Sequence, residues 1–174
     1  MTSGKVVIQK TRELDPAIAT EISALDEAHF GSIPIVKKYR LSPTDWTIYV
    51  TAQGRMVSSA KIVERLGQFD QNRVRLGGVN NVITRAECRG QGFSSIAMRK
   101  ANDFILSELK CDFGLLLCAT ELIPFYRRLG WQVVKSSLHF DQPEGKVKWE
   151  AETMILSKGS ANEPEKIDLI GLPW

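Results

Sequence analysis

The stretch Arg89-Gly90-Gln91-Gly92-Phe93-Ser94 combines residue types that could hold an anion. Gly90 and Gly92 allow a sharp turn, and without a Cβ atom they let an anion approach the backbone closely. Apolar residues at helical spacing follow, so the peptide N–H groups after Gly92 form the open first turn of a predicted helix. Such a terminus has unpaired donors and a dipole equivalent to about +0.5 charge, which suits a diphosphate. Arg89 can add a charge-assisted hydrogen bond.

Two other phosphate-binding patterns do not fit this stretch. A P-loop needs Gly-Lys-Ser/Thr after its glycines, and the sequence contains none. A dinucleotide-binding fingerprint needs a third Gly or Ala at position 95, where Ser95 stands. A tight glycine turn that only caps a helix is the purely structural interpretation. The Gly-x-Gly pattern alone does not separate that interpretation from an anion site.

The elements that must position this turn follow from hydrophobic periodicity. Asp15-Pro16 is typical of a helix start, and the apolar spacing carries that helix to about Phe30. Gly77-Gly78 inside one predicted strand indicates a bulge or a backbone that something approaches closely. Strands are predicted at Val6–Gln9, Trp46–Thr51, Met56–Leu66, Arg73–Arg85, Leu115–Cys118, Trp131–Val134 and Val147–Leu156, with further helices at Gly92–Leu109 and Ile123–Leu129.

This order of elements predicts one α/β domain with a mixed sheet, which suits a chain of 174 residues. We assign residues 1–158 to the domain and residues 159–174 to a C-terminal tail. The tail is polar as far as Glu165 and apolar from Ile167 to Trp174. An apolar end after a polar linker is expected to dock back on the domain.

The turn and a second motif together resemble a known superfamily. Arg89–Ser94 resembles the R/Q-x-x-G-x-G/A acyl-CoA signature of the GNAT acetyltransferases, with Ser94 where Gly or Ala is usual. Downstream, Pro124-Phe125-Tyr126-Arg127-Arg128-Leu129-Gly130-Trp131 resembles the Phe-Tyr-x-x-x-Gly-aromatic signature of the same superfamily. The order of elements agrees from about Val6 to Leu156. The resemblance implies a GNAT-like, mostly antiparallel sheet of about six to seven strands flanked by helices.

The resemblance also implies a cosubstrate, acetyl-CoA, and roles for individual residues. The backbone of Val82, Ile83 and Thr84 would pair with the pantetheine arm, and Tyr126 would direct its hydroxyl at the sulfur. The departing sulfur carries negative charge as the C–S bond breaks, so a tyrosine held against it can donate a hydrogen bond or a proton. A free thiol titrates near ~8.5, below a phenol at ~10. The diphosphate would be held by Arg89, Gly90, Gln91, Gly92, Phe93 and Ser94.

The acceptor amine must lose a proton before it attacks. An alkylamine with a pKa of about 10.4 needs roughly 4–5 kcal/mol to reach its neutral form at pH 7. In the superfamily a glutamate on the strand before the turn often takes this proton, whereas Asn80 and Asn81 stand here. The candidates are Glu121, which could equally be a solvated acid at a helix start, and the terminal carboxylate of Trp174.

The chain end carries a second, more distant resemblance. Asp168-Leu169-Ile170-Gly171-Leu172-Pro173-Trp174 is similar to the Asp-Trp-x-x-Gly-x-x-Trp ending of aminoglycoside 2′-N-acetyltransferases, with Leu169 in place of the internal Trp. The similarity implies an N-acetyltransferase for a small-molecule primary amine, with an aminoglycoside-like compound as one candidate. The alternative is a non-catalytic acyl-CoA-binding or sensing module of the same fold, which Asn80 favours and Tyr126 disfavours.

Composition and charge argue against disulfide-rich, metal-binding, membrane and nucleic-acid-binding proteins. The three cysteines, Cys88, Cys111 and Cys118, have neither a disulfide framework pattern nor zinc-ligand spacing, so no metal is expected. No apolar run reaches the ~20 residues of a membrane span and no secretory leader is evident, so a cytoplasmic protein without membrane contact is expected. With a net charge of +3 and no stacking aromatics among its basic clusters, nucleic-acid binding is not expected. The superfamily resemblance also implies a homodimer.

Overall fold

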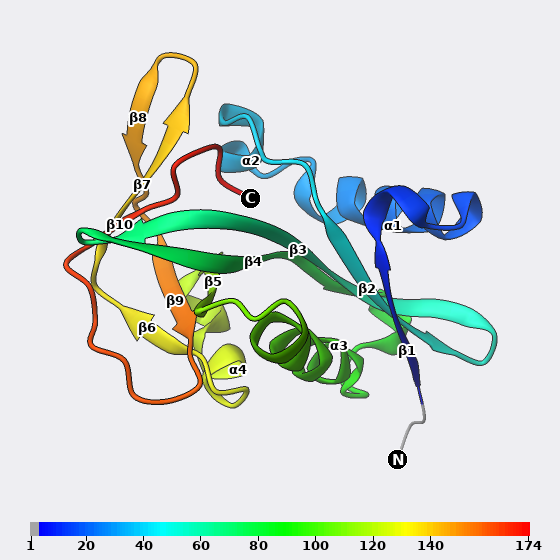
Figure 1. Cartoon of the computed structure of the whole chain (residues 1–174). Coiled ribbons are helices and arrows are strands. Elements are labelled where there is room, and N and C mark those ends of the chain that lie inside the picture. The colour runs from blue at the N-terminus through cyan, green and yellow to red at the C-terminus, as the bar shows by residue number, and fades with distance from the viewer. Residues whose placement is uncertain (1–3) are drawn as a thin grey trace.

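The computed structural model describes residues 4–174, and one curved mixed sheet forms its centre (Figure 1). Along the sheet the order is β6-β9-β5-β4-β3-β10-β7-β8, and β2 joins β3 while β1 joins β2. The strands are β1 Lys5–Lys10, β2 Trp46–Ala52, β3 Arg55–Phe69, β4 Asn72–Thr84, β5 Phe113–Cys118, β6 Gln132–Val134, β7 Ser137–Gln142, β8 Gly145–Lys148, β9 Glu152–Leu156 and β10 Lys166–Asp168. The helices are α1 Pro16–Phe30, α2 Pro34–Lys38, α3 Phe93–Asp103 and α4 Ile123–Arg127, with a π-helical turn at Phe104–Glu108 and 3-10 turns at Thr11–Glu13, Ala86–Cys88 and Thr120–Leu122.

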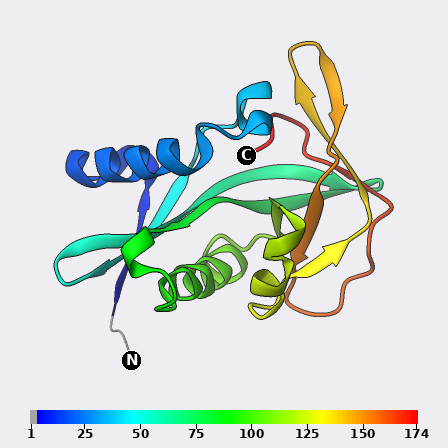
Figure 2. The same ribbon diagram turned by 180° about the vertical axis from the view of Figure 1, so that it is seen from behind.

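Helices cover both faces of this sheet. Figures 1 and 2 show α1 and α2 on one face and α3 and α4 on the other. The main core cluster lies under α3, where Phe93, Ala97 and Ala101 pack against the central strands. A smaller cluster, with Ile22 of α1 against Tyr49 and Met56, holds α1 to the opposite face. None of the helices within residues 4–174 is long and apolar enough to cross a bilayer.

Local sequence explains where two of the helices begin. Asp15 caps α1 by accepting a hydrogen bond from the N–H of Ala17 at 2.9 Å, and Pro16 occupies the first helical position. Gly92 precedes α3 with φ of +83°, a left-handed conformation that glycine adopts without strain. The helix predicted to reach Leu109 continues past Asp103 only as the π-helical turn.

Strands β4 and β5 diverge partway along their length. They pair in parallel from Leu76 opposite Phe113 to Val79 opposite Leu116, but β4 continues to Thr84 without β5 beside it. On its other edge β4 contains a bulge, because Asn81 and Val82 lie opposite the single residue Ala60. Asn81 has φ of +47°, as the extra residue of a bulge often does. The divergence opens the sheet at its centre.

The bulge is therefore at Asn81, and the expectation of a bulge at Gly77-Gly78 is wrong. The close-approach alternative holds for both glycines. A Cβ atom on Gly77 would lie 2.6 Å from a methyl carbon of Ile105, and one on Gly78 would lie 2.1 Å from the indole of Trp174. Because neither glycine has a side chain, Ile105 can pack against β4 on one face of the sheet and Trp174 on the other.

The mixed, mostly antiparallel sheet flanked by helices confirms the predicted fold class, but within residues 4–174 it has ten strands rather than six to seven. The single strand expected at Val147–Leu156 is two strands with different partners. Strand β8 pairs with β7 in an exposed hairpin, while β9 is buried between β5 and β6. Alternation of apolar residues continues across residues 149–151, so periodicity did not reveal the change of partner.

The C-terminal residues extend the sheet and then cross its face. Strand β10 pairs antiparallel with β3 and parallel with β7. After β10, the chain runs back over β3 and β4 to end beside α2 (Figure 1). Arg65 donates to the carbonyl of Leu172 at 2.7 Å and lies 5.4 Å from the Trp174 ring, and the N–H of Ser42 donates to the carbonyl of Pro173 at 2.7 Å. Trp174 is only 7% exposed.

Candidate active site

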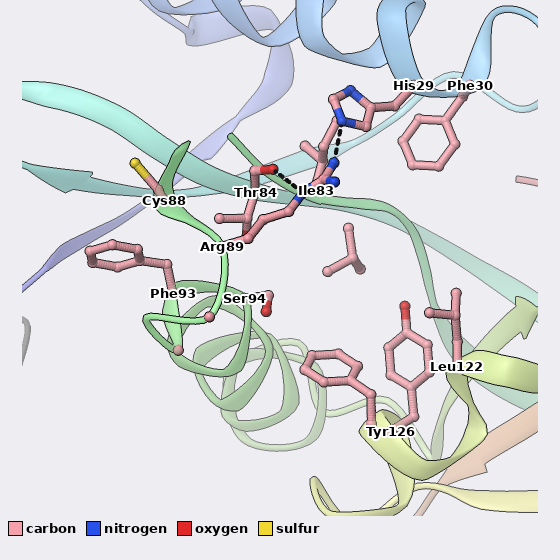
Figure 3. Close-up of a pocket in the computed structure, with 14 residues that line it drawn as sticks. His29, Phe30, Ile83, Thr84, Cys88, Arg89, Phe93, Ser94, Leu122 and Tyr126 are labelled. Carbon is pink, nitrogen blue, oxygen red and sulfur yellow. Dashed lines mark hydrogen bonds between the residues drawn. The ribbon is translucent and has the colours of Figure 1, made fainter. Parts of the chain in front are cut away.

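A cleft of about 450 Å³ lies where β4 and β5 diverge (Figure 3). Its walls come from the end of α1, the end of β4, the turn into α3, and α4 with the 3-10 turn before it. The lining residues are His29, Phe30, Val82, Ile83, Thr84, Cys88, Arg89, Gly90, Gly92, Phe93, Ser94, Leu122, Phe125 and Tyr126. Segments far apart in the sequence therefore form one site.

The turn at Arg89–Ser94 has the properties of an anion site. Gly90 and Gly92 have φ of +75° and +83°, and a Cβ atom on either would meet nothing within 4 Å, so their backbone is open to a ligand. Within residues 4–174 the N–H groups of residues 90–95 make no backbone hydrogen bond. Phe93 is 2% exposed, so its side chain serves the core and only its N–H is available to a ligand.

Arg89 reaches from the turn across the cleft toward α1 (Figure 3). One terminal nitrogen of its guanidinium lies 2.6 Å from Nε2 of His29, and its Nε donates to the carbonyl of Thr84 at 3.4 Å. The guanidinium is exposed, so both contacts can exchange for an anionic partner without leaving a buried charge.

The end of β4 presents a free edge to the cleft. Ser58 and Ser59 of β3 pair with Thr84 and Ile83 on one side, while β5 stops pairing at Val79 on the other. Ser58 also donates from its hydroxyl to the carbonyl of Ile83 at 2.7 Å, which reinforces this end of the strand. An extended ligand can add to such an edge as a further strand does.

Tyr126 stands on the wall opposite the turn and directs its hydroxyl into the cleft (Figure 3). The carbonyl of Tyr126 accepts hydrogen bonds from the N–H groups of Leu129 at 2.9 Å and Trp131 at 3.2 Å, which closes the end of α4. Asn102 of α3 accepts from the Trp131 indole at 3.0 Å and so fixes this end to the core. The phenol is 7% exposed, and burial, with a smaller effect of Cys118, raises its pKa. Tyr126 is therefore protonated at neutral pH.

Most of the residues predicted for the site meet in this cleft, and three do not. Gln91 lines a different hollow beside Arg55 and Glu87. Glu121 lines a polar hollow of about 520 Å³ on the other side of the 3-10 turn. Trp174 packs against Gly78 and is not among the residues that line the cleft.

Sequence reasoning did not select five lining residues: His29, Phe30, Cys88, Leu122 and Phe125. Phe125 lies inside the quoted downstream motif, so that motif could have indicated it. His29 continues the apolar row of α1 formed by Ile18, Ile22 and Leu25, and a lone polar residue in that row was the available signal. Nothing in the sequence shows that the end of α1 reaches Arg89, sixty residues later.

Comparison with solved structures supports the fold. The solved structures that resemble this chain include Escherichia coli ElaA (14% identity, 89% of this chain and 100% of that chain, TM-score 0.66) and a putative N-acetyltransferase from Lactobacillus plantarum (17%, 88% and 97%, 0.62). They also include the Escherichia coli GNAT family N-acetyltransferase YhbS in complex with CoA (15%, 98% and 96%, 0.64). At these identities the likeness shows the fold. No curated protein sequence matches the chain significantly.

A family model is more decisive. The model described as an acetyltransferase (GNAT) domain matches residues 15–134, which is well over half of the chain and includes both motifs and the whole cleft. The superfamily predicted from the two motifs is thereby confirmed. The protein belongs to the GNAT acetyltransferases, enzymes that take their acetyl group from acetyl-CoA.

Proposed function

We propose that this acetyltransferase acetylates a primary amine of a small cationic molecule, with aminoglycoside-like polyamines as the first candidates. The observation that carries the proposal is the cleft itself. It joins an anion-binding turn, a free strand edge and a buried tyrosine hydroxyl in one cavity. Its volume of about 450 Å³ lies within the range of roughly 300–1,000 Å³ that is usual for small-molecule sites.

The two ends of the cleft suit the two ends of the cosubstrate. The open N–H groups of residues 90–95 would hold the diphosphate, with Arg89 as its charged partner. The edge of β4 at Val82–Thr84 would pair with the amide groups of the pantetheine arm. Gln91 faces away from the cleft, so only its backbone N–H would take part.

Tyr126 would then serve the leaving group. A phenol with a raised pKa keeps its proton and donates a hydrogen bond to the sulfur as negative charge develops there. Burial in an apolar wall makes that hydrogen bond stronger than the same contact in water.

Acidic residues beside the cleft support a cationic acceptor. Glu121, Glu150 and Glu152 line the polar hollow next to the 3-10 turn, together with one lysine, Lys135. Leu122 follows Glu121 directly and lines the cleft, so hollow and cleft share one segment as their border. An excess of carboxylates attracts an ammonium compound toward the acetyl group.

The proposal is tested by following thiol release from acetyl-CoA with a panel of acceptors. The panel contains aminoglycosides, linear polyamines, simple monoamines and amino acids at equal concentration. We expect kcat/KM to be highest for the polycationic amines and to fall with ionic strength, because the attraction is electrostatic. Activity confined to neutral or anionic amines would refute the acceptor class, and absence of release with every amine would refute amine acetylation.

A further inference from the structure

We propose that His29 is the proton acceptor for the amine in this site. The inference rests on the proposed function, because it presupposes an amine acceptor. It adds a catalytic residue on a helix that carries neither of the two motifs, and it places a base in a cleft that lacks both carboxylates considered from the sequence.

Elimination among the lining residues leads to His29. Four of the residues that line the cleft are titratable: His29, Cys88, Arg89 and Tyr126. A guanidinium does not give up its proton, and Tyr126 keeps its own because burial raises its pKa. Cys88 lies on the far side of Arg89 from Tyr126 (Figure 3). His29 is the remaining titratable residue of the lining, and an imidazole nitrogen with a lone pair can accept a proton.

The hydrogen bonds of His29 show which ring nitrogen is free to do so. Nδ1 lies 3.0 Å from the carbonyl oxygen of Leu25, which can only accept, so Nδ1 carries the hydrogen. Nε2 lies 2.6 Å from a guanidinium nitrogen of Arg89, which can only donate, so Nε2 presents a lone pair. The two contacts require the same neutral tautomer. Its basic nitrogen faces the cleft.

The helix that carries His29 is fixed to the sheet. Glu21 of α1 pairs with Arg85 at 2.9 Å, and Asp26 forms an ion pair with Lys61 beneath the helix. Lys61 faces this part of α1 from β3, and Arg85 and Arg89 face it from the segment after β4. Figure 3 shows His29 and Phe30 descending from α1 on one side of the open space and the Tyr126 hydroxyl rising from the other. The proton acceptor and the hydrogen-bond donor therefore occupy opposite walls.

The contact between His29 and Arg89 implies that acetyl-CoA binds before His29 can take a proton from the amine. While Arg89 donates to Nε2, the lone pair is occupied. A diphosphate at the turn offers the guanidinium a charged partner, which is a stronger one than a neutral imidazole. Binding of acetyl-CoA thus draws Arg89 away and frees Nε2 for the amine.

The proton balance closes with His29 as the acceptor. The ammonium group passes one proton to Nε2 of His29, and the neutral amine forms the N–C bond at the thioester carbonyl. The C–S bond breaks while Tyr126 donates a hydrogen bond to the departing sulfur. The surplus proton of the amide nitrogen passes to the thiolate, and His29 returns its proton to solvent. One proton is released for each amide formed.

The decisive variant is His29→Gln, whose amide oxygen can still accept from Arg89 but cannot take a proton. We expect kcat at pH 7 to fall roughly 100-fold or more, with the Kd for acetyl-CoA within about threefold of wild type. The deficit should shrink as pH rises toward the amine pKa of about 10.4, because solvent then removes the proton. Added imidazole should restore part of the activity of His29→Gly. The matched control is His139→Gln in β7, the other histidine of the chain, which should behave as wild type.

Several outcomes would overturn the assignment. One is a His29→Gln enzyme with near-normal kcat, and another is a loss that is equal at every pH and is not relieved by imidazole. A third is the appearance of the pH-dependent deficit in Glu121→Gln, or on removal of Trp174, instead of in His29→Gln. In each of these cases the wild-type enzyme still acetylates amines and the proposed function stands. A wild-type enzyme that acetylates no amine would refute both.

Discussion

The indole of Trp174 lies directly against the backbone of Gly78. A Cβ atom at Gly78 would be 2.1 Å from Cε2 and 2.3 Å from Cζ2 of the ring, which is far inside van der Waals contact. Glycine at this point of β4 thus lets the last residue of the chain pack on the central strand, beside the place where β4 and β5 diverge.

The first prediction concerns this contact. Gly78→Ala should lower the free energy of unfolding by about 1–3 kcal/mol, because the added methyl overpacks against the ring. Chemical denaturation measures the change. Gly159→Ala is the control, since a Cβ atom there meets nothing within 4 Å, and it should change stability little. In the Trp174→Ala background, Gly78→Ala should lower the free energy of unfolding by less than it does in the wild type. An equal loss in both backgrounds would show that the added methyl group does not clash with the Trp174 ring.

The second prediction separates anion binding from backbone strain. Gly92→Ala should raise the Kd for CoA at least tenfold, because a methyl group would stand where the diphosphate meets the backbone. Gly54→Ala is a matched control, with φ of +77° against +83° and open space around both positions. Both variants should lose similar stability, about 1–2 kcal/mol. Calorimetric titration measures the affinities, and equal affinity for the two variants would contradict the placement of the diphosphate.

The third prediction concerns the leaving group. Tyr126→Phe should lower kcat by roughly 100-fold while the Kd for acetyl-CoA stays nearly constant, because the hydroxyl matters mainly as charge develops on sulfur. Steady-state thiol release and equilibrium binding measure the two quantities. Phe125→Leu changes the neighbouring cleft wall without removing a hydroxyl, and it should affect binding more than kcat.

The fourth prediction concerns stability at alkaline pH. Burial, first among the causes, raises the pKa of Cys111 and of Cys118 from 9.0 to about 11. The unfolded chain releases these protons at lower pH than the folded one, so it binds fewer protons above about pH 9. The free energy of unfolding should therefore be highest below pH 9 and fall between about pH 9 and pH 11. The decline should be less steep in Cys111→Ala, whose difference from wild type at pH 7 reports the packing change alone.

Local sequence was sufficient for the parts of the site that depend on neighbouring residues. Positive φ at Gly90 and Gly92, and the open N–H groups after them, follow from a glycine turn that enters a helix. The position of Tyr126 at a closed helix end follows similarly from the downstream motif. The superfamily could be recognised because these two local patterns occur together.

Long-range packing determined the rest. The bulge at Asn81 depends on the register of β4 against β3, and the division of Val147–Leu156 depends on a change of partner strand, neither of which alters the apolar pattern. The contacts of Arg89 with His29 and of Gly78 with Trp174 join residues that are distant in the chain. Amino-acid type and spacing set which backbone conformations are accessible, and so determined the turn, the helices and the class of sheet. Which side chains share the cleft was decided only when the sheet closed, because contacts between distant segments depend on how all the strands pack together.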